Sequence, residues 1–179
     1  MKTLLLLEWL RLRKYKTFWV FIILFVVSLV GINYILHTVQ TQTKGLSQGR
    51  ANFHIFSFPQ AWSTTAWAGG LSVLLLGLLT ITLVTNEYSF KTHRQQIIDG
   101  ISRKGFISEK WLTILILAIF TWIIYFFGTI IIGVKPQNVS VFNGFYYAGY
   151  FFVKTILSLS VAFMFALLFK RSSLAIALY

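Results

Sequence analysis

The sequence predicts an all-α membrane protein, a polytopic bundle of transmembrane helices that forms a single membrane domain over residues 1–179. Two observations support this expectation: 57% of the residues are hydrophobic with a mean hydropathy of +0.75, and these residues come in long runs. A soluble domain of this size has no use for so much apolar surface. A run of about 20 mainly apolar residues is instead long enough to cross a bilayer as a helix.

Four apolar stretches meet or approach the length of a membrane span. They cover residues 17–36, 61–85, 111–134 and 148–169. The segment before the second span, residues 53–62, contains Pro59 and is expected to lie partly at the membrane interface. The chain is therefore predicted to cross the membrane at least four times.

Residues 172–179 turn apolar again directly after a Lys-Arg pair. As a helix, this segment reaches only about 12 Å, against a hydrocarbon core of about 30 Å. We therefore expect these residues to be the start of a fifth helix that the sequence does not complete.

Positive charge is distributed unevenly between the two sides of the expected bundle. Twelve of the sixteen Lys and Arg residues lie before the first span, in the loop at residues 86–110, or directly after the fourth span. Cytoplasmic loops of membrane proteins carry an excess of Lys and Arg. The N-terminus and the 86–110 loop are therefore predicted to be cytoplasmic, in a multi-pass protein of the plasma membrane.

The net charge of +12 could indicate a nucleic-acid-binding protein. Such modules, however, spread Lys and Arg over a polar folded surface, whereas here the charge lies in short patches between apolar runs. Anionic lipid headgroups or an acidic partner surface are the expected partners, and no nucleic acid. The chain has no cysteine, and its three histidines share no metal-ligand spacing, so no metal site is expected.

The segment before the first span is predicted to form an amphipathic helix on the inner leaflet. Its apolar face would carry Leu5, Trp9 and Leu12, while Glu8, Arg11 and Lys14 would lie elsewhere on the helix. Such a helix places its Trp at headgroup level and its cations near anionic lipid. The alternative is a plain basic flank of the first span.

The 86–110 loop contains three of the four acidic residues and could form a short helix of its own. A helix from Phe90 onward would put Phe90, Ile97 and Ile101 on one stripe. Gly100 and Gly105 are expected to interrupt it before the third span. A charged, partly apolar helix between two spans suits docking into a partner's groove, and the alternative is a basic loop that touches only water and lipid.

These segments resemble the membrane-spanning subunits of ABC-2 type ATP-binding-cassette transporters. In that family, the loop between spans two and three commonly has an acidic residue, a Thr followed by Arg, a Ser-Arg pair, and a Lys that opens the next helix. The matching residues here are Glu87, Thr92, Arg94, Ser102, Arg103 and Lys110. The Glu8 to Lys14 stretch is similar to the family's usual basic entry.

The resemblance implies a permease subunit of an ABC exporter, in which ATP hydrolysis by a separate ATPase drives translocation. The loop helix would then be the coupling helix that contacts the ATPase. Its expected contact residues are Glu87, Phe90, Thr92, Arg94, Ile97, Ile98, Ile101, Ser102 and Arg103. A second permease subunit, identical or different, would complete the pathway. The chain has no G-x-x-x-x-G-K-[ST] loop, so we expect the partner to bind ATP and this chain to be no enzyme and to hold no cofactor.

The chain departs from the family pattern in three places. Lys91 precedes the Thr where the family often has Gly, and Asp99-Gly100 stands where Pro is frequent. Family members usually have six spans, and the last two are absent from this sequence. The transported substrate is not readable from these helices.

Three other functions can be compared with the sequence: a hydrolase, an ion-coupled secondary transporter and a membrane anchor. The Gly45 to Gly49 stretch matches the G-x-S-x-G elbow of hydrolases but lacks the large sheet that the motif needs. An ion-coupled secondary transporter would be expected to have carboxylates inside spans, and only Lys154 is ionisable there; its depth favours a side chain that reaches the interface. A non-transporting membrane anchor differs from a permease only in whether the basic loop contacts an ATPase, and stays open.

Overall fold

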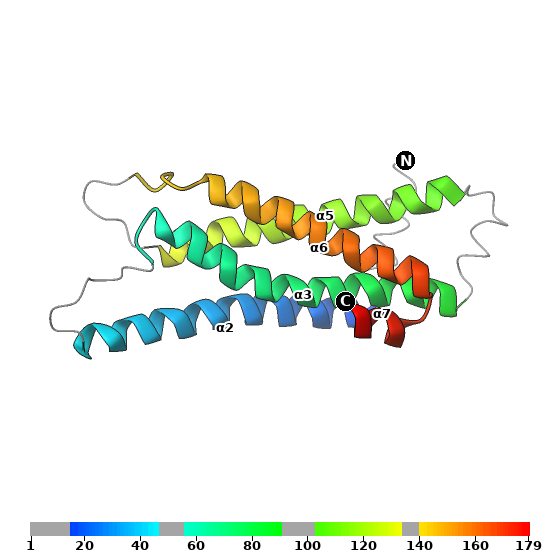
Figure 1. Ribbon diagram of the computed structural model, residues 1–179, viewed down its shortest axis with the longest axis horizontal. Coiled ribbons are helices and arrows are strands. Elements are labelled where there is room, and N and C mark those ends of the chain that lie inside the picture. Colours follow the sequence, from blue (N-terminus) through cyan, green and yellow to red (C-terminus); the bar gives the residue numbers. More distant parts are fainter. Residues whose placement is uncertain (1–14, 47–55, 91–102, 134–139) are drawn as a thin grey trace.

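The structure, a computed structural model, describes residues 15–46, 56–90, 103–133 and 140–179. Its regular elements in these ranges are α2 (Lys16–Leu46), α3 (Gln60–Ser89), α5 (Arg103–Ile132), α6 (Tyr146–Phe169) and α7 (Ser172–Leu178). The four long helices run side by side along the length of the molecule, and α7 lies against them near one end (Figure 1). The expected all-α helical bundle is confirmed.

Four helices are long and apolar enough to cross a membrane. Their candidate spans are Lys16–Val39, Gln60–Ser89, Ile107–Ile132 and Tyr146–Phe169. Each overlaps one of the four stretches expected from hydropathy. The chain is therefore an integral membrane protein with several crossings.

Two helices extend further than hydropathy indicated. Helix α2 continues to Leu46, and α5 begins at Arg103, so that it passes through Gly105. The expectation that Gly105 interrupts the helix was wrong. A glycine inside a helix costs only about 1 kcal/mol relative to Ala, and the hydrogen bonds of a long packed helix outweigh that cost.

Helix α3 is the centre of the bundle, because α2, α5 and α6 all pack against it. Its side chains at Trp62, Leu76 and Leu79 are completely buried. At Gly69, a Cβ would come within 3.0 Å of the Phe151 ring of α6. The absence of a side chain there lets α3 and α6 approach closely, as small residues do between membrane helices.

Polar side chains also join α3 to α5 inside the bundle. The hydroxyl oxygens of Thr65 and Thr129 are 2.7 Å apart, and the Tyr125 hydroxyl donates a 2.8 Å hydrogen bond to the carbonyl oxygen of Trp62. All of these side chains are buried. A polar group without a partner is costly in hydrocarbon, so these bonds favour one particular pairing of the two helices.

In the described part of the expected interfacial segment, the aromatic side chains are buried, whereas Pro59 and Gln60 are exposed. Phe56 and Phe58 are nearly fully buried, and the Trp62 Nε1 donates a 2.9 Å hydrogen bond to the carbonyl oxygen of Val141. These side chains therefore close one end of the bundle. Burial inside the protein does not fix the depth of the segment in a bilayer, so its place at the membrane interface stays a prediction.

Helix α7 follows a sharp reversal of the chain. Lys170 adopts a left-handed backbone conformation with φ of 52°, which ends α6 and turns the chain back. Helix α7 then packs on α3 and α6, where the Tyr179 hydroxyl lies 2.6 Å from the Ser158 hydroxyl and the Tyr179 ring covers Gly77. The residues after Arg171 thus begin a further helix, as expected.

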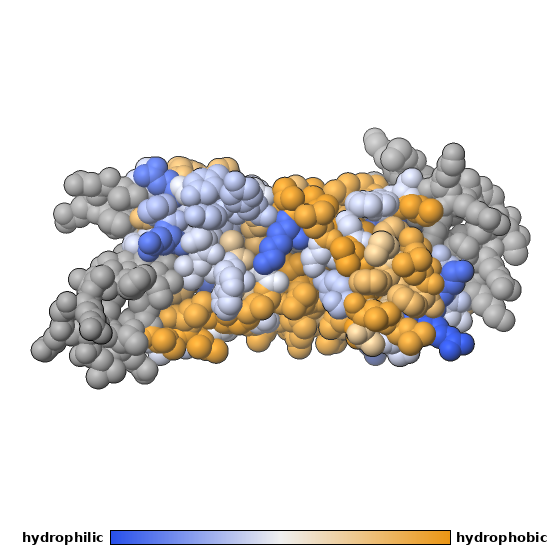
Figure 2. All heavy atoms as spheres, viewed as in Figure 1, coloured by the Kyte–Doolittle hydropathy of each residue, from blue (hydrophilic) through white to orange (hydrophobic). Residues whose placement is uncertain are grey.

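On the face of the bundle that Figure 2 shows, the surface is largely apolar except at the end where α6 begins. Val27, Ile131 and Leu168 are each more than half exposed. A surface of this kind is unfavourable in water but is solvated by lipid chains. Lys154 is exposed on α6 within this surface, and its ammonium lies against Gly70 of α3.

Candidate functional site

Four helix ends meet at one end of the bundle, which we call the loop end. Helix α2 begins there, α3 ends, α5 begins and α6 ends. In the sequence, residues 91–102 join the end of α3 to the start of α5, and both of these helix ends lie at the loop end (Figure 1). The residues expected to contact an ATPase are therefore carried by, or directly adjoin, these helix ends.

A buried ion pair joins the two helices on either side of this connection. The Lys110 Nζ of α5 lies 2.6 Å from the Glu87 Oε1 of α3, and the two side chains are 4% and 10% exposed. A buried charge is tolerated when it is paired and hydrogen-bonded, and removing one partner leaves the other uncompensated. The pair therefore fixes the end of α3 to the first turns of α5.

Two further contacts tie the remaining helices to the same point. The Asn86 Nδ2 of α3 donates a hydrogen bond to the hydroxyl of Tyr15, the residue that directly precedes α2. The Lys170 ammonium, at the end of α6, lies 5.9 Å from the centre of the Tyr88 ring of α3. Helix α3 is thus held to α2, α5 and α6 by consecutive side chains, Asn86, Glu87 and Tyr88.

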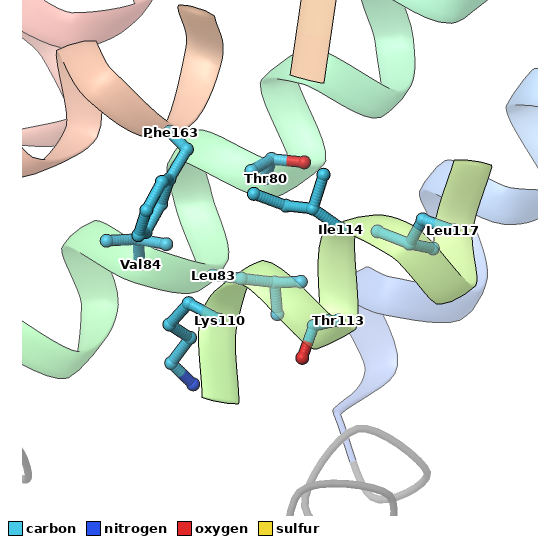
Figure 3. Close-up of a pocket in the computed structure, with 8 residues that line it drawn as sticks. All are labelled: Thr80, Leu83, Val84, Lys110, Thr113, Ile114, Leu117 and Phe163. Carbon is cyan, nitrogen blue, oxygen red and sulfur yellow. The ribbon is translucent and has the colours of Figure 1, made fainter. Parts of the chain in front are cut away.

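The space behind the ion pair is almost completely filled. A cavity of about 10 Å³ lies between α3, α5 and α6, with Lys110 on one side and Phe163 on another (Figure 3). It is lined by Thr80, Leu83, Val84, Lys110, Thr113, Ile114, Leu117 and Phe163. Its volume is at the lower limit for one water molecule, so the helices here move together as a packed unit.

Only three of the residues predicted to contact an ATPase, Glu87, Phe90 and Arg103, are among those that the structure describes. Glu87 faces the interior of the bundle, whereas Phe90, which directly follows α3, is 75% exposed. Arg103 is the first residue of α5. The predicted positions outside the described residues are Thr92, Arg94, Ile97, Ile98, Ile101 and Ser102 in the loop, and Leu5, Glu8, Trp9, Arg11, Leu12 and Lys14 in the N-terminal helix.

Sequence reasoning missed the partners at the loop end. Lys110 was expected to open its helix, but it lies seven positions after the first residue of α5, on the side that faces Glu87. An acidic and a basic residue at the near ends of two consecutive spans were a usable signal for a pair. The contact of Asn86 with Tyr15 had no such signal, because both residues are common at membrane interfaces.

Side chains that could bind a metal ion do not gather at the loop end in the part of the chain that the structure describes. No group of three or more His, Asp or Glu side chains comes together among these residues in a way that could hold a metal ion. Glu87 and Lys110 neutralise each other in the interior. The arrangement is suited to holding helices in fixed positions and to passing a displacement of the loop on to them.

The fold and the loop end together define a multi-pass membrane protein whose spans are tied together beside a basic connecting segment. Comparison with known proteins then gives the family: the model for the ABC-2 family transporter protein matches residues 4–179. The chain belongs to the ABC-2 transporter family. No curated protein and no solved structure matched the chain.

Membership of this family has two direct consequences. The chain is the membrane-embedded component of a transporter, a part that is not itself catalytic. Membrane proteins of this family generally act with ATPase subunits. The resemblance that the loop residues indicated is thus confirmed for the chain as a whole.

Proposed function

We propose that this chain is the permease subunit of an ABC exporter, and that residues 90–102 form the segment that contacts a separate ATPase subunit. The observation that carries the proposal is the buried Glu87–Lys110 pair in a member of the ABC-2 family. The pair lies where the connecting segment leaves α3 and joins α5. A movement of that segment would therefore reach both helices at once.

The exposed surface next to the pair supports a protein contact at this position. Phe90 presents a large apolar side chain at the loop end, and the following residues to Lys110 contain five cations and two acids. An aromatic anchor within a charged rim is typical of protein interfaces. ATP would bind to the partner, and its hydrolysis would move the loop.

Two further parts of the proposal concern neighbours in the membrane. A second permease subunit, identical or different, would complete the pathway, as the likeness to this family implies. The N-terminal residues from Leu5 to Lys14 would lie on anionic lipid headgroups at the cytoplasmic face. In this arrangement the loop end faces the cytoplasm.

Co-purification tests the proposal. The full-length protein is solubilised in mild detergent from its native membrane and isolated, and bound ATP-binding-cassette ATPase is identified by mass spectrometry. We expect an ATPase to be retained, and Arg94→Glu with Ile97→Glu to abolish its retention, because the changes reverse a charge and place a carboxylate on the apolar stripe.

Two matched changes serve as the control. Lys135→Glu with Val139→Glu introduces the same types of substitution into the segment between α5 and α6, away from the loop end. This variant should retain the ATPase. Failure of the unchanged protein to retain any ATPase would contradict the proposal and favour a non-transporting anchor or an ion-coupled secondary transporter.

A further inference from the structure

A second cavity lies away from the loop end, between α2 and α5. Its volume is about 270 Å³. It is lined by Val30, Asn33, Tyr34, His37, Ile131 and Ile132. This volume is far larger than that of the cavity beside Lys110, and it approaches the volume of small-molecule binding sites.

Asn33 gives this cavity an unusual polar group. Its side chain is 1% exposed, and its Nδ2 donates a 2.8 Å hydrogen bond to the carbonyl oxygen of Leu29. Among the residues that the structure describes, no donor reaches the Asn33 Oδ1. A buried acceptor without a donor is unfavourable, so such groups usually have a partner. Rotation about the last torsion of Asn, which is soft, would present Oδ1 to the cavity in exchange for the hydrogen bond of Nδ2 to Leu29.

The rim of the cavity adds aromatic and apolar surface. Tyr34 is 71% exposed and Ile131 is 81% exposed, and the ring of His37 lies 5.8 Å from that of Phe56. Exposed side chains of a membrane-spanning helix face lipid. The cavity therefore opens toward the lipid, and a Tyr ring beside its mouth attracts a cation.

The depth of the cavity matches the level of lipid headgroups. Ile131 and Ile132 are the last two residues of α5, so the cavity lies where that helix ends. Ligands at this level have a polar end close to the interface and apolar chains deeper in the membrane. A phospholipid satisfies both requirements.

We propose that this cavity binds the headgroup of a phospholipid with a primary ammonium group, with Asn33 Oδ1 as the hydrogen-bond acceptor. The ammonium supplies the missing donor to Asn33 and lies near the Tyr34 ring. Val30, Ile131 and Ile132 then contact the upper part of the lipid. This site does not depend on the proposed contact with an ATPase.

Two lipids that differ only in their N–H donors test the site. The purified full-length protein is titrated with phosphatidylethanolamine or phosphatidylcholine of the same acyl chains, and native mass spectrometry measures the lipid retained per chain. We expect a preference of roughly tenfold for phosphatidylethanolamine, which is the effect of one hydrogen bond with a charged donor. Phosphatidylcholine keeps the positive charge but cannot donate.

Substitutions test whether the preference for phosphatidylethanolamine arises at this cavity. Asn33→Leu should reduce the ratio of the two lipids to about one, because it removes the acceptor at nearly constant volume. Asn143→Leu, which changes an exposed asparagine before α6, should keep the full preference. Ile131→Trp, at an exposed position on the mouth, should lower retention of phosphatidylethanolamine by filling the cavity, and it remains informative if Asn33→Leu does not fold.

Three outcomes would overturn the proposal. Equal retention of both lipids by the unchanged protein would remove the need for a donor. A preference that persists in a folded Asn33→Leu protein would place the lipid elsewhere. Unchanged retention of phosphatidylethanolamine in Ile131→Trp would exclude this cavity as its location.

Discussion

Glu87 and Lys110 place opposite charges in the interior of the loop end, where neither side chain is open to solvent. Lys154 presents the contrasting case, since it belongs to the same type as Lys110 but is exposed on the outer surface of α6. A buried charge depends on its partner, whereas an exposed lysine can extend along apolar surface toward the membrane interface. The two lysines are therefore expected to respond differently to the same substitution.

Lys110→Met should lower the free energy of unfolding by about 3–5 kcal/mol, because it leaves the Glu87 carboxylate buried without its ammonium partner. Thermal unfolding of the purified protein in detergent measures the change. Adding Glu87→Gln to Lys110→Met should cost less than the sum of the two single changes, because the pair is then removed as a unit. Simple additivity would show that the two side chains are not coupled.

Lys154→Met should change the free energy of unfolding by no more than about 0.5 kcal/mol, as is usual for an exposed position away from special features. The same unfolding measurement applies, so this variant is also the control for Lys110→Met. A large loss of stability would contradict the interfacial interpretation and indicate that Lys154 has an anionic partner in the membrane.

At the scale of elements, helix α7 is held in place by the fit of one aromatic ring to one glycine. The Tyr179 ring lies directly over Gly77 of α3, where a Cβ would overlap it. At Gly70, the neighbouring atom is the flexible end of Lys154, and at Gly31 no atom is near. The three glycines therefore differ in what a side chain would displace.

Gly77→Ala should release α7 from the bundle, because the added methyl group overlaps the Tyr179 ring. The chain has no cysteine, so Ala175→Cys, at a fully buried position of α7, gives a unique thiol. We expect maleimide to label this thiol slowly in the otherwise unchanged protein and at least several-fold faster with Gly77→Ala.

Gly31→Ala is the matched control and should leave the labelling rate unchanged. Gly70→Ala should also have little effect, since the end of a lysine side chain can move away. Equal labelling with and without Gly77→Ala would mean that the contact with Gly77 does not hold α7.

For the whole molecule, the main open prediction is its orientation in the membrane. The exposed Phe90 marks the loop end, and the exposed Asn143 lies in the turn before α6, where α6 begins at the opposite end. Because positive charge is concentrated at the loop end, the loop end is expected to face the cytoplasm.

Single cysteines at these two positions test this orientation. Asn143→Cys should react with a membrane-impermeant maleimide added to intact cells, whereas Phe90→Cys should react only after the membrane is permeabilised. The reverse pattern would show that the loop end faces outward, where an ATPase that uses cytoplasmic ATP could not reach it.

Prediction from sequence succeeded where a property is local to one segment. Hydropathy located all four long helices, because the length of a span is set by the thickness of the bilayer. It failed at Gly105, where packing against other helices decides whether a helix continues. It also did not indicate which aromatic rings at residues 56–62 are buried. The family was recognisable from the spacing of Glu87, Arg103 and Lys110 between two spans.

The sequence by itself determined the class of this protein, its four apolar helices and its membership of a transporter family, since these follow from composition and from order along the chain. Only the tertiary structure decided that Glu87 pairs with Lys110, that Tyr179 covers Gly77, and that Asn33 lines a cavity beside α5. These contacts join residues on different helices. Their formation depends on the rotation and depth of each helix in the bundle, which hydropathy does not fix.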